Sequence, residues 1–409
     1  MVVSQYFWPE NFRVNDLVSE LVRRGHEVIV LTGQPNYPGG AVFPEFAANP
    51  AKFASYAGAD VVRVGMLPRG SGGLRLILNY LSFALSASML GPIKLRGRKV
   101  DAIFVFEPSP ITVGLPAIML KWIKRAPIAF WVLDLWPQSL AAVGAVRSPL
   151  VLSLVDRLVR FVYAHSDRVL AQSRSFVGVI RKQMKDAGRI VYFPSWAEPA
   201  PALDGVAPAP ELHARPDLFT IVFTGNVGDA QDFPAVLDAA ERLRDNPVRW
   251  VIVGDGRRSE WLAEEVARRG LAEQVKLLGR FPLDRMPSFF RHADALLVSL
   301  RDEPIFALTI PGKVQSYLAA GIPILAMLNG EGADIVASSG AGLAVPASDS
   351  AALAGAVLRM RDMSEEERTI MGGNGIACVN SQFDRATLIT QLETLLGELK
   401  ASYGKRSTV

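Results

Sequence analysis

The segment VNDLVSELVRRGHEVIVL, residues 14–31, decides the fold. In its first half the apolar residues recur at the i, i+3, i+4, i+7 spacing of one helix face, which predicts an amphipathic helix. Two arginines then precede Gly25, a pattern typical of a helix end, because cations favour the negative helix pole and glycine readily adopts positive φ. The run His26–Leu31 predicts a strand.

The same order of helix, glycine and strand recurs at residues 261–278 and 314–326. The predicted strands Ala102–Phe106, Ile128–Leu133 and Trp250–Val253 are apolar throughout, as parallel strands are when helices cover both faces of the sheet. The sequence therefore predicts an α/β protein with doubly wound parallel sheets and right-handed crossovers.

A chain of 409 residues allows two or three domains. Five prolines fall within residues 199–216, which predicts a linker, since proline stiffens the chain and lacks an N–H group. We expect a first domain over residues 1–198 and a second over residues 217–382, opening with the strand Phe219–Phe223. Residues 383–409 are expected to form a last amphipathic helix followed by a polar tail.

Composition excludes several classes of protein. Half of the residues are apolar and 21% are charged, which excludes a disordered chain. The net charge of +4 is too small to suggest nucleic acid as a partner. The single cysteine, Cys378, fits a reducing compartment, and the four scattered histidines show no metal-ligand spacing. No secretory signal is expected at the N-terminus.

Residues 60–130 are unusually basic. They contain three acidic and ten basic residues, a surplus of seven positive charges. The same region holds the apolar stretch Leu74–Leu90 and the sequence MLKWIKR at residues 119–125. Because cations attract anionic headgroups and aromatic residues favour the interface, this region predicts peripheral contact with a membrane. The alternative is a soluble domain whose helices carry basic outer faces.

In the second half, the stretch TIPGKVQSYLAAGIPIL at residues 309–325 is the most informative. Pro311 near a helix start would leave Gly312 and Lys313 in the first turn, where free N–H groups attract phosphate. Gln315 and Ser316 would be placed to bond ligand hydroxyl groups. The alternative is an ordinary surface helix with a solvated lysine.

Two loops that follow predicted strands in the second half are further candidates. In Gly225-Asn226-Val227-Gly228 the glycines allow close approach of backbone to a ligand, and the asparagine can donate to it. In the second loop, Arg280 and Phe281 suit a diphosphate and a base, or are ordinary rim residues.

In the first half, Asp134 follows the predicted strand Ile128–Leu133 and is a candidate to contact a hydroxyl nucleophile, or is a turn aspartate. Glu10, Asn11 and Arg13 lie in an aromatic loop and are candidates to contact a polar substrate. Asn11 would equally serve as a helix cap.

Taken in order, these segments resemble the family-4 glycosyltransferases of the GT-B fold, and most of all the branch that builds bacterial surface polysaccharides such as colanic acid and O-antigen. The matching segments are QYFWPENFRVNDLVSELVRRGHEVIVLTGQPNYPGG (5–40), LDLWPQS (133–139), FTGNVGDAQDF (223–233), VGDGRR (253–258), LLGRFP (277–282), TIPGKVQSYLAAGIPIL (309–325) and GEGADIV (330–336).

The resemblance implies two Rossmann-like domains that face each other across a cleft, with the last helix crossing back to the first. It implies a retaining, metal-independent transfer from a nucleotide-diphosphate sugar, a UDP-sugar, to a polyprenyl-diphosphate-linked or oligosaccharide acceptor, without a cofactor. The enzyme would be cytoplasmic and peripheral on the inner face of the plasma membrane. Asp134 and Lys313 would be catalytic, and Glu10, Asn11 and Arg13 would bind the acceptor. The donor would be bound by Gly225, Asn226, Gly228, Arg280, Phe281, Thr309, Gly312, Gln315 and Ser316.

The chain departs from the wider family at several of these places. Leu308 and Ser316 stand where the family has two glutamates, and Leu133 stands where it often has a histidine. The diphosphate would then be bound by Lys313, Arg280 and the helix start, and Asp134 would take the catalytic role on the acceptor side. Two alternatives stay open: a catalytically silent, membrane-docked partner of a polysaccharide assembly complex, and a GT-B sugar-nucleotide epimerase.

Overall fold

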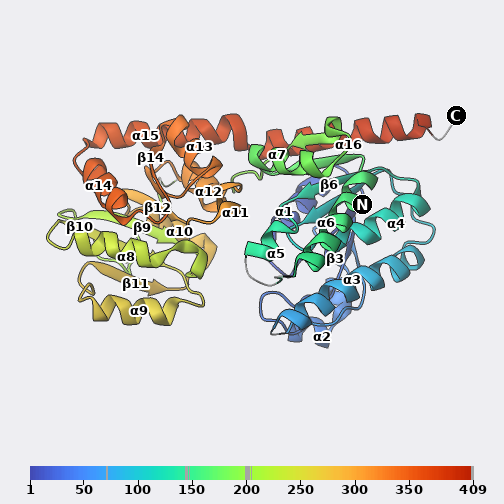
Figure 1. Ribbon diagram of the computed structural model, residues 1–409, viewed down its shortest axis with the longest axis horizontal. Helices are drawn as coiled ribbons and strands as arrows, with labels where there is room; N and C mark the ends of the chain where they lie inside the picture. The colour runs from blue at the N-terminus through green and yellow to red at the C-terminus, as the bar shows by residue number, and fades with distance from the viewer. Residues whose placement is uncertain (71, 143–145, 147, 199–202, 204, 407–409) are drawn as a thin grey trace. The chain divides into compact units, whose positions relative to one another are not determined.

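The computed structural model describes residues 1–409 apart from 71, 143–145, 147, 199–202, 204 and 407–409. The chain divides into two compact units. Unit 1 comprises Met1–Pro194 with Ala386–Val409, and unit 2 comprises Ser195–Arg385. Each unit is built on one predominantly parallel sheet with helices packed against it (Figure 1).

The sheet of unit 1 has the strand order β3-β4-β2-β1-β5-β6-β7-β8, and only the β3–β4 pair is antiparallel. Its strands are β1 (Val2–Val3), β2 (Ile29–Thr32), β3 (Ser55–Tyr56), β4 (Ala59–Arg63), β5 (Ile103–Glu107), β6 (Ile128–Val132), β7 (Arg168–Ala171) and β8 (Ile190–Tyr192). The helices of unit 1 are α1 (Arg13–Arg23), α2 (Pro44–Ala48), α3 (Gly73–Lys94), α4 (Gly114–Lys124), α5 (Gln138–Ala142), α6 (Pro149–His165), α7 (Arg174–Gln183) and most of α16 (Arg385–Arg406).

The α/β fold and the first predicted helix and strand are confirmed, with shifts at their ends. Helix α1 buries Val14, Leu17, Val18 and Leu21, and Gly25 after it has φ of 90°. Strand β2 begins at Ile29 rather than His26, because the residues before Val28 are exposed and do not pair with a neighbouring strand.

Strands β5 and β6 lie side by side and are buried along their whole lengths. The sequence predicted the end of β5 at Phe106, whereas the strand continues to Glu107, which pairs with Val132. A buried carboxyl group therefore occupies the carboxyl end of β5.

The sheet of unit 2 is parallel throughout, in the order β11-β10-β9-β12-β13-β14. Its strands are β9 (Phe219–Thr224), β10 (Val248–Val253), β11 (Val275–Gly279), β12 (Ala295–Ser299), β13 (Ile324–Met327) and β14 (Gly342–Val345). Its helices are α8 (Phe233–Arg242), α9 (Ser259–Arg268), α10 (Met286–Phe290), α11 (Pro304–Ala307), α12 (Gly312–Ala320), α13 (Glu331–Ser339), α14 (Ser350–Arg361) and α15 (Glu365–Cys378). The order reverses between β9 and β12, the point at which sheets of this kind bind ligands.

The proline-rich segment that was predicted as a linker has no helix or strand among its described residues. Residues 199–202 and 204 of it lie outside the described part. Downstream, the backbone N–H of Ala209 donates to the carbonyl oxygen of Ser288 at 2.9 Å, and the His292 ring bonds the carbonyl oxygen of Ala209 at 3.0 Å. This part of the segment therefore packs on α10 of unit 2.

The last helix belongs to unit 1 from Ala386 onward. Glu393 on α16 pairs with Arg24 and His26, at 2.6 Å in both cases. Lys400 pairs with Asp101 at 3.0 Å, and the buried side chains of Leu388, Ile389 and Leu392 line the helix.

Candidate functional site

The predicted phosphate-binding lysine lies at the reversal point of the unit 2 sheet. Helix α12 begins at Gly312, as expected, and carries Lys313 in its first turn. The Lys313 Nζ lies 4.9 Å from the centre of the Phe223 ring near the end of β9. A Cβ built on Gly225 would lie 2.9 Å from the same Nζ. The ammonium group therefore lies against the loop that follows β9.

Two glycines allow the strand-end loops to meet at this point. Gly225 has φ of 126° and Gly254, after β10, has φ of 155°. A Cβ on Gly254 would lie 1.8 Å from the carbonyl oxygen of Gly225, so that only glycine fits there. Gly254 thus lets the two loops approach each other backbone to backbone.

Charge at this point is uncompensated. In the part of unit 2 that the structure describes, no carboxylate pairs with Lys313, and burial lowers its pKa to about 8. Among the described residues, no side chain caps the first turn of α12, whose N–H groups point toward the helix start. A half-buried cation beside such N–H groups favours an anionic ligand.

The other predicted donor residues differ in their exposure. The side chains of Asn226 and Arg280 are exposed, as is the backbone at Gly225 and Gly312, while Gly228 and Thr309 are half-buried. Phe281 is half-buried, and its ring centre lies 4.8 Å from that of Phe289.

Gln315 and Ser316 have partners within the protein. Gln315 is buried, and its Nε2 donates to the carbonyl oxygen of Ser195 at 2.6 Å. Ser316 Oγ donates to the carbonyl oxygen of Gly312 at 3.1 Å, within the same helix. Direct contact of these two side chains with a donor stays a prediction.

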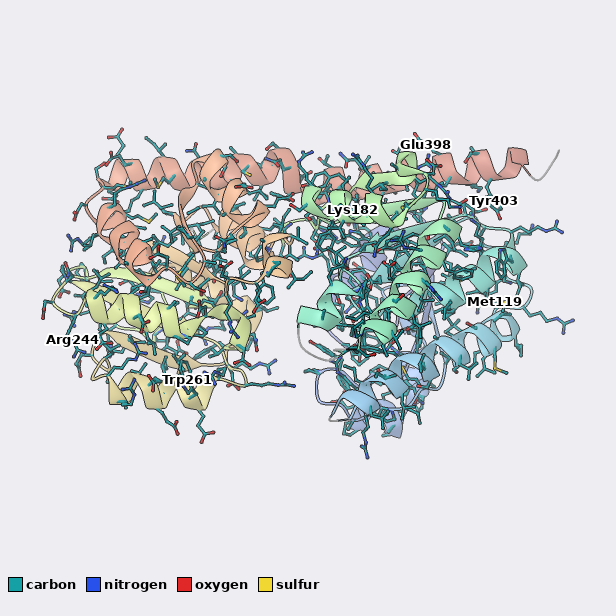
Figure 2. The ribbon with its side chains drawn as sticks, in the orientation of Figure 1. Met119, Lys182, Arg244, Trp261, Glu398 and Tyr403 are labelled. Carbon is teal, nitrogen blue, oxygen red and sulfur yellow. The ribbon has the colours of Figure 1, made fainter. Side chains whose placement is uncertain are left out.

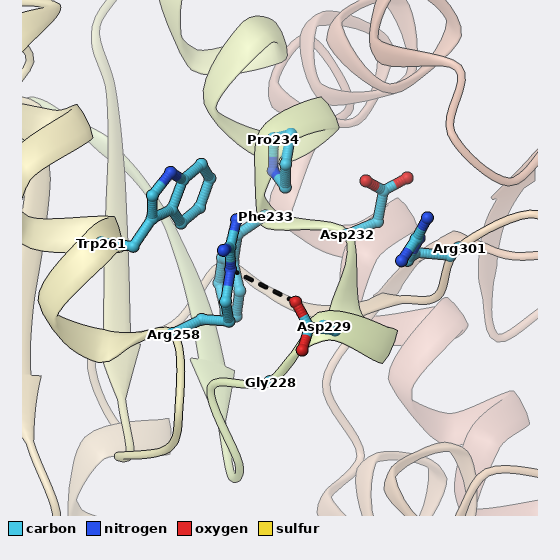
Figure 3. Close-up of a pocket in the computed structure, with 8 residues that line it drawn as sticks. All are labelled: Gly228, Asp229, Asp232, Phe233, Pro234, Arg258, Trp261 and Arg301. Atoms are coloured by element: carbon cyan, nitrogen blue, oxygen red, sulfur yellow. Dashed lines mark ion pairs between the residues drawn. The ribbon is translucent and has the colours of Figure 1, made fainter. Parts of the chain in front are cut away.

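A pocket beside the Gly225 loop was not predicted from the sequence. It has a volume of about 220 Å³ and is lined by Gly228, Asp229, Asp232, Phe233, Pro234, Arg258, Trp261 and Arg301 (Figure 3). Arg258 pairs with Asp229 at 3.4 Å, and its guanidinium carbon lies 4.0 Å from the centre of the Trp261 ring. These residues come from three separate segments, and only the fold brings them together.

In unit 1, Asp134 follows β6, where the sequence placed it. Its Oδ2 accepts a hydrogen bond from Trp136 Nε1 at 3.1 Å, and its Oδ1 accepts one from Ser139 Oγ. Burial raises the pKa of Asp134, and these hydrogen bonds oppose the shift. The carboxylate is therefore held in one orientation at the carboxyl edge of the sheet.

The predicted acceptor loop is built around Glu10. This carboxylate is buried and accepts hydrogen bonds from the backbone N–H groups of Phe7 at 3.1 Å, Asn36 at 2.8 Å and Tyr37 at 2.7 Å. It thus fixes two loops to each other, and its contact with an acceptor stays a prediction. Asn11 in the same loop is exposed, and Arg13 is half-buried.

Arg69 joins this loop cluster and was missed from the sequence, because it is distant along the chain. Its Nη1 donates to Tyr6 Oη at 3.2 Å, and its guanidinium carbon lies 5.3 Å from the centre of the Tyr37 ring. The Tyr6 and Phe12 rings stack with their centres 5.3 Å apart. An aromatic and cationic surface therefore accompanies Asn11 and Arg13.

Unit 1 also exposes many large apolar side chains on three helices, α3, α4 and α6. Helix α4 packs against both of the others. On α4, Met119 is labelled in Figure 2 and is 38% exposed. The full set, here called the apolar face, is Leu74, Ile77, Leu78, Leu81, Leu85, Met89, Leu90 and Ile93 on α3, Met119, Trp122 and Ile123 on α4, and Leu150, Val151, Leu154 and Phe161 on α6. Helix α3 has 22 residues and is long and apolar enough to cross a membrane, and a third of its most apolar window is buried.

No metal centre was predicted. Over the described ranges, the structure contains no group of three or more His, Cys, Asp or Glu residues placed to hold a metal ion.

Comparison with known proteins agrees with this division of the chain. Residues 11–196 match the family model described as a glycosyl transferase 4-like domain, and residues 219–362 match the model for glycosyl transferases group 1. The two matches together span both sheets.

Two curated bacterial proteins and one solved structure are similar to the chain. A probable glycosyltransferase of Pseudomonas aeruginosa, WbjE, is 28% identical over 58% of this chain, which spans 62% of that protein. A putative colanic acid biosynthesis glycosyl transferase of Escherichia coli, WcaI, is 28% identical over 75% of this chain and 76% of that protein. The Anabaena protein HepE, solved with UDP and glucose, superimposes with a TM-score of 0.66 at 15% identity, over 97% of this chain and 99% of that one.

The expected GT-B fold is confirmed by the structural likeness, which extends over nearly the whole chain. Both halves also match glycosyltransferase models in chain order: the first half belongs to the glycosyl transferase 4-like domains, and the second half belongs to the glycosyl transferases group 1.

Proposed function

We propose that the chain transfers a sugar with retention of configuration from a UDP-sugar to a lipid-linked acceptor in bacterial surface polysaccharide synthesis, without a metal ion. The observation that carries the proposal is Lys313, a half-buried cation without a carboxylate partner in the described part of unit 2, set at the reversal point of the sheet. Such a site suits the diphosphate of a nucleotide-sugar.

The donor side of the proposal rests on unit 2. Departure of the nucleotide develops negative charge on the β-phosphate, and donors already fixed there stabilise the transition state more than the ground state. Lys313 and the first turn of α12 supply such donors, and the exposed side chains of Asn226 and Arg280 would add to them. The solved structure of HepE with UDP and glucose supports UDP as the nucleotide.

The acceptor side rests on unit 1. Asp134 is held by Trp136 and Ser139 and is placed to orient an acceptor hydroxyl group. Asn11, Arg13 and the Arg69 surface would bind the rest of the acceptor. The colanic acid enzyme of E. coli supports a surface-polysaccharide acceptor.

The apolar face supports a lipid-linked acceptor and a peripheral position on a membrane. Four exposed cations near the face, Lys94, Arg96, Lys99 and Arg125, pair with no carboxylate in the described part of unit 1. Apolar side chains enter the acyl boundary while cations attract anionic headgroups. A cytoplasmic enzyme on the inner face of the plasma membrane would meet both its donor and its acceptor there.

The proposal is tested by incubating the full chain with UDP-, GDP- and dTDP-sugars and a polyprenyl-diphosphate acceptor, and by reading product mass and anomeric configuration. We expect transfer from a UDP-sugar in the presence of EDTA, with the donor configuration retained. Lys313→Ala should lower kcat/KM by about 100-fold, as does the loss of one oxyanion donor. The matched control is Lys276→Ala, since Lys276 is a half-buried lysine of β11 that lies 3.7 Å from Glu273.

The silent-partner alternative is favoured by Leu308 and Ser316, which stand in place of the family's glutamates. It predicts neither transfer nor hydrolysis of any nucleotide-sugar, with or without calorimetric binding of UDP. Transfer or slow hydrolysis of a UDP-sugar to UDP by the wild type, lost in Lys313→Ala, excludes it.

A further inference from the structure

The carboxyl group of Glu107 is the most unusual buried group of unit 1. Glu107 ends β5 and is completely buried. The nearest backbone N–H groups, those of Leu133 and Asp134, oppose a rise in its pKa, but neither carboxyl oxygen has a hydrogen-bond partner among the described residues. Burying an ionised carboxylate without hydrogen-bond donors costs free energy, so the protonation state of Glu107 needs an explanation.

Asp134 is its counterpart on the next strand. Glu107 pairs with Val132 in the sheet, and the N–H of Leu133 donates to the Glu107 carbonyl oxygen at 3.1 Å, so Asp134 follows directly. The side chains of Trp136 and Ser139 donate to the Asp134 carboxylate, whereas no side chain among the described residues donates to Glu107. Hydrogen-bond donors favour the ionised form of the carboxyl group that they contact. When Asp134 and Glu107 share one proton, the proton therefore resides on Glu107.

We propose that Glu107 is a positioning residue for Asp134: it carries the proton of the pair, so that the single negative charge stays on the carboxyl group that orients the acceptor. This inference rests on the proposed function for the role of Asp134, but the location of the proton can be tested without any assay of activity.

The groups that face Glu107 are consistent with a neutral carboxyl. From β6 and its loop comes Asp134, and from α6 comes Tyr163, whose buried hydroxyl group also has no hydrogen-bond partner in the described structure. Tyr80 on α3 faces Asp134. On α4, Lys121 pairs with Asp167 at 2.6 Å and does not act on Glu107. Burial, and then the charge of Asp134, raise the pKa of Glu107 well above its usual range.

The first test is thermodynamic. A glutamate whose pKa is raised on folding loses stability as the pH rises above its ordinary value of 4.5, because only the unfolded state releases the proton. The Glu107→Gln variant has no titratable group at this position and therefore does not lose stability in this way. Its Tm should therefore rise relative to wild type as the pH increases from 4.5 to 8. The matched control is Glu20→Gln: Glu20 is also buried but pairs with Arg23 and Arg24, so its loss should lower Tm at neutral pH.

The second test reads the proton directly, in case Glu107→Gln folds poorly. Infrared difference spectra of wild type at pH 7 should contain the carbonyl band of a protonated carboxyl group, absent from the spectrum of Glu107→Gln. A wild-type spectrum without that band, or an unchanged pH dependence of Tm, would show an ionised Glu107 and overturn the inference.

The third test separates positioning from a purely structural role. At saturating donor, kcat of wild type should fall at high pH, when ionised Glu107 repels Asp134. In Glu107→Gln, the pH at which kcat falls should be higher by about one unit or more, since no negative charge can form at position 107. An unmoved limb would reduce Glu107 to a structural residue. A complete lack of transfer would instead count against the proposed function and leave the first two tests intact.

Discussion

The side chain of Lys313 occupies the space that a methyl group on Gly225 would need: a Cβ at that glycine would lie 2.8 Å from Lys313 Cε and 2.9 Å from its Nζ. The glycine and the lysine belong to segments almost ninety residues apart, at the end of β9 and the start of α12. The missing side chain at one position therefore sets the place of the cation at the other.

We therefore expect Gly225→Ala to weaken UDP binding by about tenfold or more, since the change strains the backbone at a φ of 126° and displaces the ammonium group. Isothermal calorimetry measures the effect. The control is Gly373→Ala in α15, where a Cβ meets nothing within 4 Å and the variant should bind UDP normally. Equal affinities of Gly225→Ala and wild type would remove Lys313 from the UDP site.

Lys313→Met should be more stable than wild type although it no longer binds the donor. Burial lowers the pKa of Lys313 from 10.5 to about 8, so its charge costs stability at every pH below 8. The gain at pH 7 should be about 3 kcal/mol, and it should shrink as the pH rises from 8 to 10.5. Denaturant unfolding at several pH values measures it. A less stable variant would mean that the lysine is compensated in the free protein.

UDP binding should take up a proton above pH 8. Lys313 has then largely lost its charge in the free protein, and the diphosphate restores it. Calorimetry in buffers of different ionisation enthalpy measures the uptake, which should vanish in Lys313→Met. Affinity should fall as the pH increases beyond 8. A pH-independent affinity up to pH 10 would contradict a contact between this ammonium group and the ligand.

Activity should fall at acid pH as Asp134 becomes protonated. This acid limb should lie above pH 3.8, the ordinary pKa of an aspartate, because burial raises the pKa of Asp134. Ser139→Ala removes a hydrogen bond to the carboxylate, so the limb should move to higher pH. Asp134→Asn should lower kcat by about 100-fold or more. Ser402→Ala on α16 is the matched control and should leave the profile unchanged. The assignment of Asp134 fails if Ser139→Ala leaves the acid limb where it is in wild type.

Membrane binding should depend on the apolar face. Leu81 and Leu85 on α3 are 52% and 64% exposed, and Leu81→Asp with Leu85→Asp should reduce co-sedimentation with anionic vesicles by about tenfold or more. Ile370→Asp with Ile376→Asp on α15 of unit 2 is the control, because these isoleucines are similarly exposed. Both wild type and control should bind less to neutral vesicles. Equal binding by both pairs would show that the apolar face is not the docking surface.

The sequence predicted the elements and turns that carry a local signal. It did not predict the groups of distant residues that the fold brings together. Apolar periodicity located α1, whose Leu17, Val18 and Leu21 are buried. The phosphate-binding turn at Gly312 carries a local signal and was found. Arg258, Trp261 and Arg301 carry none, because they meet only when β9, β10 and β12 lie side by side. Glu107 was missed because it continues an apolar strand, and nothing in the sequence marks it as unpaired.

Unit 1 is assembled from two pieces of chain with the whole of unit 2 between them. On the ribosome, the residues of unit 2 emerge before α16, so unit 2 can complete its sheet while unit 1 still lacks the helix that carries Glu393 and Lys400. Unit 1 is thus completed only when α16 docks, and a chain that stops short of residue 386 lacks a part of unit 1. The native state of unit 1 therefore requires that the segments on both sides of unit 2 have been synthesised.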